Sequence, residues 1–125
     1  MRILRQLVWC LILACAWPGN SSCQTVNEIL KQAGALESSG QLKGALEIYR
    51  TLYTNNPGRV DILYRFEDLL SKTGQREEAI LILQEHLSRS PQDITAHFRL
   101  GDALFNSGLH EEAFQHWDRV LDGAT

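Results

Sequence analysis

The sequence has few of the features that mark a disulfide-stabilised or nucleic-acid-binding protein. Its 125 residues contain three cysteines, and all of them (Cys10, Cys15 and Cys23) fall within the first 23 residues, so the rest of the chain has no disulfide available to it. The formal net charge is −3, and no basic stripe with interleaved aromatic residues is present, so nucleic acid is not expected as a partner. Residues 24–125 must therefore be stabilised by packing alone.

The one long apolar run, Leu7 to Trp17, follows Arg2 and Arg5 and precedes a Pro-Gly pair. This order is typical of a secretory signal. The 11 apolar residues would make a helix of only about 16 Å, short of the roughly 30 Å hydrocarbon core of a bilayer. The pattern predicts that residues 1–23 are a signal peptide and that the protein is exported, to the periplasm or the exterior.

Two fates of Cys23 stay open. Ser21 and Cys23 provide the small residues that a signal peptidase requires, which would leave Gln24 as the first residue. Alternatively, the segment NSSC resembles a bacterial lipobox, although Asn20 stands where that motif has an aliphatic residue. Lipidation at Cys23 would tether the protein, and membrane contact is expected only in that case.

The sequence contains no pattern that predicts an enzyme. It has no glycine-rich phosphate loop and no nucleophile paired with a base, and its paired carboxylates (Glu77-Glu78 and Glu111-Glu112) open expected helices, where the helix dipole favours negative charge. Its four histidines, His86, His97, His110 and His116, lack the spacing of a helical metal pair. We expect no catalytic residue, no metal and no cofactor, and we expect His86 and His97 to be packed in the core.

A 34-residue period dominates the remaining sequence. It relates the glycines Gly40, Gly74 and Gly108, the alanines Ala45, Ala79 and Ala113, and the prolines Pro57 and Pro91. The period divides the chain into units 26–59, 60–93 and 94–125, each with two helical patterns around its glycine.

Each repeated residue has a structural reason. Glycine ends the first helix of a unit because it adopts the left-handed conformation without a steric penalty, and alanine lets the paired helices cross closely. Thr25 with Glu28 forms a capping box, and Asp93 is a second N-cap. The second helices are expected to begin near Leu42, Arg76 and His110 and to end near Tyr53, Leu87 and Leu121.

This pattern resembles the tetratricopeptide repeat. The third unit matches best, through Leu100-Gly101, Leu104, Gly108, Ala113 and Trp117, whereas Gln32 and Glu67 depart from the pattern. The resemblance implies an all-α, right-handed superhelical solenoid of three antiparallel helix pairs over residues 24–125. It also implies a non-catalytic protein-interaction scaffold.

In that family the first helices of successive units line a concave groove that binds a peptide or helix of a partner protein. The resemblance assigns partner contacts to Lys31, Tyr64, Arg65, Asp68, Phe98, Arg99 and Asp102. Lys31, Arg65 and Arg99 repeat at one position and predict a basic ladder that suits a segment with acidic and apolar residues.

The last helix raises further alternatives. The sequence stops after the third unit without a polar capping helix, so Phe114, Trp117 and Leu121 are expected to be partly uncovered. Self-association through this helix is one interpretation, and an N-terminal fragment of a longer repeat protein is another. A lipid-anchored envelope assembly factor, tethered at Cys23, is the alternative for the whole protein.

Overall fold

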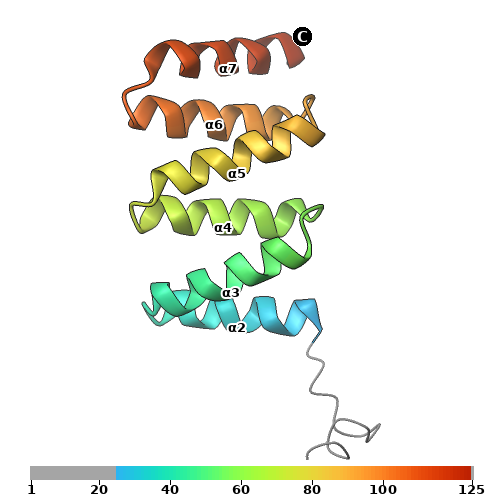
Figure 1. Ribbon diagram of the computed structural model, residues 1–125, viewed down its shortest axis with the longest axis vertical. Coiled ribbons are helices and arrows are strands. Elements are labelled where there is room, and N and C mark those ends of the chain that lie inside the picture. Colours follow the sequence, from blue (N-terminus) through green and yellow to red (C-terminus); the bar gives the residue numbers. More distant parts are fainter. Residues whose placement is uncertain (1–24, 125) are drawn as a thin grey trace, which may run out of the picture.

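The computed structural model describes residues 25–124, which form a single stack of α-helices with no strand among them (Figure 1). The helices are α2 (Val26–Ser38), α3 (Leu42–Asn55), α4 (Val60–Lys72), α5 (Arg76–Arg89), α6 (Ile94–Asn106) and α7 (His110–Gly123). Within the described part of the chain, no helix has the length and hydrophobicity needed to cross a membrane. The predicted signal peptide and Cys23 lie outside the described residues. The expected all-α helical-repeat solenoid is confirmed.

The turn inside each helix pair has the same geometry in all three pairs. The three turn glycines have positive φ angles: Gly40 80°, Gly74 79° and Gly108 84°. The residue after each glycine donates its N–H to the carbonyl oxygen five positions earlier, at 2.8–2.9 Å. This Schellman arrangement satisfies a carbonyl group at the end of the first helix and turns the chain back antiparallel. The predicted role of the glycines is confirmed.

The helix starts agree with the sequence pattern, and the ends differ slightly. The second helices begin at Leu42, Arg76 and His110 as predicted, and the capping box at Thr25 is formed. The second helices end at Asn55, Arg89 and Gly123, two residues later than predicted. The apolar stripe stops earlier than the backbone hydrogen bonds do, because polar residues complete the last turn.

The alanines at the helix crossings are completely covered. Ala45, Ala79 and Ala113 each have 0% of their surface exposed. In the last pair, α7 approaches α6 closely because Gly101 has no side chain: a Cβ atom there would overlap the indole of Trp117. Small residues thus set the spacing between paired helices, and larger ones fill the core beside them.

Candidate protein-binding groove

A hollow of about 360 Å³ lies between α4 and α6, the first helices of two neighbouring pairs. It is lined by Glu67, Asp68 and Ser71 of α4 and by Thr95, Phe98, Arg99, Asp102, Ala103 and Asn106 of α6. Four of the seven residues predicted to contact a partner line it, namely Asp68, Phe98, Arg99 and Asp102. Phe98 is half exposed and gives the hollow an apolar contact surface.

Arg99 is held in place by carboxylates of the neighbouring helix. Its guanidinium donates to Glu67 at 2.6 Å and to Asp68 at 2.7 Å, and it lies 4.7 Å from the centre of the Tyr64 ring. Burial by itself would lower the pKa of Arg99, but hydrogen bonds to Asp68 and Glu67 raise it overall. The charge of Arg99 is therefore already neutralised within the protein.

Glu67 explains how the chain tolerates a departure from the repeat pattern. A small residue is expected between the helices at this position, yet the Glu67 side chain is only 8% exposed. Its two oxygens accept hydrogen bonds from Ser71 and Arg99. Because Ser71 and Arg99 are hydrogen-bond donors, the hydrogen-bonding capacity of the buried carboxylate is satisfied. The bond to Arg99 also joins α4 to α6. The sequence pattern indicated that Glu67 departs from the repeat, but it did not indicate that Arg99 is the partner of Glu67.

Tyr64 is less accessible than the sequence pattern suggests, because its hydroxyl donates to Asp93 at 2.8 Å. The same carboxylate oxygen lies 2.8 Å from Nε2 of the buried His86. Burial, followed by the hydrogen bond to Asp93, raises the pKa of Tyr64. Burial alone would raise the pKa of Asp93, but hydrogen bonds from His86, Tyr64 and the backbone of Ala96 lower it. Asp93 therefore joins α4, α5 and the start of α6, beyond its predicted capping role.

The predicted basic ladder is not continuous. Lys31 and Arg65 are exposed and have no ion pair or hydrogen bond within residues 25–124, whereas Arg99 is bound to Glu67 and Asp68. The structure does not bring Lys31 and Arg65 into the hollow itself. Two cations on α2 and α4 thus remain available to a ligand, and the part of the groove on α6 offers Phe98 and carboxylates instead.

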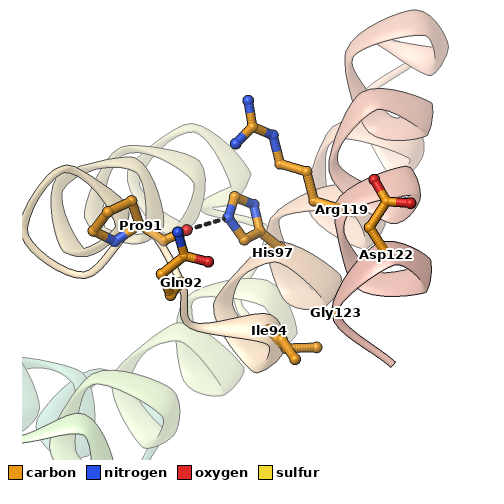
Figure 2. Close-up of a pocket in the computed structure, with 7 residues that line it drawn as sticks. All are labelled: Pro91, Gln92, Ile94, His97, Arg119, Asp122 and Gly123. Atoms are coloured by element: carbon orange, nitrogen blue, oxygen red, sulfur yellow. Dashed lines mark hydrogen bonds between the residues drawn. The ribbon is translucent and has the colours of Figure 1, made fainter. Parts of the chain in front are cut away.

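A second hollow, of about 380 Å³, lies between the N-terminal end of α6 and the C-terminal end of α7 (Figure 2). Figure 2 shows His97 pointing to the carbonyl oxygen of Pro91, which its Nε2 contacts at 2.9 Å, with Arg119 on the other side of the ring. The Nδ1 atom of His97 lies 2.9 Å from Nδ1 of His116. His86 and His97 are buried as predicted, whereas the pairing of His97 with His116 was not foreseen. No group of three metal-ligating side chains occurs among residues 25–124.

Comparison with known proteins supports one family for this solenoid. Residues 36–94, from the end of α2 to the start of α6, match the family model described as Tetratricopeptide repeat. No curated protein matches the chain.

Solved structures share the fold at low sequence identity. A crystal structure of MamA has a TM-score of 0.68 and 19% identity, over 78% of this chain and 57% of that one. MamA 41-end from Desulfovibrio magneticus RS-1 has a TM-score of 0.64 and 21% identity, over 78% of this chain and 55% of that one. The Yersinia enterocolitica type III secretion translocator chaperone SycD has a TM-score of 0.70 and 16% identity, over 84% of this chain and 78% of that one. This chain thus spans just over half the length of the MamA chains. The matched segment and the shared fold support a tetratricopeptide-repeat family for this protein.

Proposed function

We propose that this protein is a non-catalytic scaffold that binds a peptide or helix of a partner protein in the groove formed by α2, α4 and α6. The observation that carries the proposal is the hollow between α4 and α6, which four predicted contact residues line. A groove along the first helices presents side chains at regular intervals, which suits an extended or helical peptide. The fold that the chain shares with SycD, described as a chaperone, supports a protein partner.

The chemistry of the groove defines the ligand we expect. Phe98 offers an apolar contact, and Lys31 and Arg65 offer cations that no carboxylate of residues 25–124 neutralises. A suitable segment carries an apolar side chain for Phe98 and an acidic one for Arg65. Asp102 and Asp68 select against an acidic residue next to the apolar one.

We further propose that the protein acts after export, in the periplasm or outside the cell, on the basis of the apolar run and flanking arginines of residues 1–23. The alternative is a lipid-anchored assembly factor attached through Cys23. The intact mass of the mature protein separates the two, because a protein that starts at Gln24 has lost Cys23 and a lipidated one retains it with an added acyl mass.

Selection from a displayed random-peptide library tests the groove. Peptides that bind the full chain are expected to carry an acidic and an apolar residue, and Arg65→Glu is expected to weaken them by about tenfold or more, roughly 1.4 kcal/mol. The matched control is Lys43→Glu, which reverses an exposed charge on α3 outside the groove. Equal affinities for the two variants would refute the groove proposal.

A further inference from the structure

The contact between α6 and α7 contains two histidines, His97 and His116, at positions that are aliphatic in the earlier helix pairs. The aliphatic residues one and two periods earlier are Leu63 with Ile82 and Ile29 with Ile48. Leu63 and Ile82 are 1% and 5% exposed and belong to a hydrophobic core. An imidazole in such a place must find polar partners, so the third pair differs from the others in chemistry.

The two rings direct their Nδ1 atoms at each other. Nδ1 of His97 lies 2.9 Å from Nδ1 of His116, and the ring centres are 5.2 Å apart. The sequence predicted no metal because no two histidines have the spacing of a pair on one helix, but these two come from different helices. Their nitrogens are nearly as far apart as two ligands of a tetrahedral Zn²⁺ ion, which are separated by about 3.3 Å when each Zn–N bond is about 2.0–2.1 Å.

His97 is oriented as a metal-binding histidine usually is. Its Nε2 donates to the carbonyl oxygen of Pro91 at 2.9 Å (Figure 2). This bond places the proton on Nε2, so the lone pair of the neutral ring is on Nδ1 and faces His116. A backbone carbonyl commonly fixes a metal-bound imidazole in this way. The ring is 7% exposed, so the surrounding side chains also hold it in place.

His116 has the freedom to adjust to an ion. It is half-buried, and its Nε2 makes no hydrogen bond within residues 25–124. Neutral His116 can therefore carry its proton on Nε2, which leaves the lone pair of Nδ1 for coordination. The last torsion angle of a histidine side chain has a broad energy minimum, so a small turn of the ring toward an ion costs little.

An open hollow of about 430 Å³ gives access to the two histidines. It lies among α5, α6 and α7, and its lining includes both imidazoles and the polar side chains of Gln84, Ser88 and Gln115. An ion held by two histidines needs further ligands, and this space can admit the water molecules that supply them. The pair itself lies between α6 and α7, so its geometry does not depend on any residue beyond α7.

We propose that His97 and His116 bind a zinc ion through their Nδ1 atoms and that the ion joins α6 to α7, with water in its remaining positions. Neutral imidazole nitrogen suits Zn²⁺, and this ion imposes no geometry of its own. Mg²⁺ and Ca²⁺ require oxygen ligands and are not expected to bind. Two protein ligands are fewer than the four of a structural zinc site, so the ion is expected to exchange with solvent. This site is separate from the groove.

Arg119 limits the affinity of the site. It lines the same hollow, and Figure 2 shows it beside the His97 ring. Its positive charge opposes a cation, so Arg119→Gln is expected to tighten zinc binding several-fold. The same charge would favour an anion in the hollow, so the direction of this change separates a metal site from an anion site.

The experiment titrates Zn²⁺ into the untagged full chain and measures the heat of binding, with Mg²⁺ as the negative control. The double variant His97→Leu/His116→Ile restores the aliphatic residues of the second pair, so it is expected to fold and to bind zinc at least tenfold more weakly. The matched control, His110→Ala, removes an exposed histidine of α7 and is expected to bind as the unaltered protein does. All these proteins keep the same three cysteines, so zinc bound by cysteine does not alter the comparison.

Two further measurements report on the site directly. Nitrogen-15 spectra of the histidine rings are expected to show zinc on Nδ1 and a proton on Nε2 in both His97 and His116. Thermal denaturation is expected to show a midpoint that rises with zinc concentration in the unaltered protein and rises less in the double variant, because zinc bound to the folded state stabilises it.

Three results would overturn the proposal. One is equal zinc affinity in the unaltered protein and the double variant. Another is a spectrum in which zinc leaves the His97 signals unchanged or binds Nε2 of either ring. The third is weaker zinc binding in Arg119→Gln, since removal of a nearby positive charge cannot weaken a cation held only by these two imidazoles.

Discussion

Gly74 shows how a single residue type is imposed by backbone geometry. Its φ of 79° lies in the left-handed region, and a Cβ atom there would meet no neighbour within 4 Å. The cost of a side chain is therefore conformational and does not come from a clash. Gly58, in the turn between two helix pairs, does not have a positive φ and is equally open.

Gly74→Ala is accordingly expected to lower the free energy of unfolding by about 1 kcal/mol or more, because alanine is strained in the left-handed conformation. Gly58→Ala serves as the control and is expected to be neutral or slightly stabilising. Urea denaturation followed by circular dichroism measures both. Equal effects would show that the turn at Gly74 does not require glycine.

His116 is a residue whose protonation the fold opposes. Nε2 of His97 donates to the Pro91 carbonyl oxygen, so in neutral His97 the Nδ1 atom accepts a hydrogen bond from Nδ1 of His116. Burial is the main cause that lowers the pKa of His116, and the nearby His97 and Arg119 lower it further. The folded state therefore binds a proton at His116 less readily than the unfolded state does.

The sign of the pH dependence follows from this shift. Above pH 6.5, the ordinary pKa of histidine, the lowered pKa of His116 does not destabilise the folded state. Below pH 6.5 the unfolded state binds the proton more readily, so the free energy of unfolding decreases as pH falls. Denaturation series between about pH 7.5 and about pH 5 are expected to show this loss, and His116→Asn is expected to flatten it. The lowered pKa of Asp93 affects the free energy of unfolding in a separate pH range, below the ordinary carboxyl pKa of 3.8. An unchanged slope in His116→Asn would contradict the prediction.

At the scale of elements, α4 and α6 are joined by a charged contact as well as by apolar packing. Glu67 is 8% exposed and depends on Arg99, whose own side chain is 29% exposed. Removing one partner of such a pair leaves the other charge insufficiently solvated, which costs more than the pair contributes in total. The repeat thus provides a matched control, because Arg65 stands at the same position one period earlier and has no ion pair within the described part of the chain.

Arg99→Ala is expected to lower the free energy of unfolding by about 2 kcal/mol, and Arg65→Ala by less than about 0.5 kcal/mol. Adding Glu67→Ala to Arg99→Ala is expected to recover part of the loss, since the unpaired carboxylate is then absent. Urea denaturation of the three variants provides the values. If both single variants lose the same amount, the contact between Glu67 and Arg99 does not stabilise the stack.

For the whole molecule, stability is distributed along one dimension. Each helix packs on its neighbours in the stack, so α2 and α7 each have one buried residue, Ala33 and Ala113, whereas α4 has six. In a stacked-repeat protein, stability is approximately the sum of unit and neighbour terms, and end units open first.

Amide hydrogen exchange is therefore expected to be slowest in α4 and fastest in α2 and α7. Mass spectrometry of peptides from each helix, under native conditions, measures the difference. Uniform protection along residues 25–124 would indicate that the stack unfolds as one cooperative unit.

The sequence by itself determined the architecture, because the architecture rests on local rules repeated at a fixed spacing. The glycine of each turn, the alanine of each crossing and the caps at Thr25 and Asp93 each act within a few residues of their own position. The 34-residue period then stacks the resulting helix pairs without any long-range information. The four predicted residues that meet in the groove follow from the same register.

Only the tertiary structure decided which of those side chains are available to a ligand. Arg99 and Arg65 are equivalent in the repeat, yet one is bound to Glu67 and Asp68 and the other is not. Partners 29 to 32 residues apart, such as Tyr64 with Asp93 and Arg99 with Glu67, meet through the stacking of separate helices. The difference between Leu121, which is 66% exposed, and Leu87, which is 8% exposed one period earlier, has the same origin, because burial depends on which helices pack against a residue and its repeat position does not encode that.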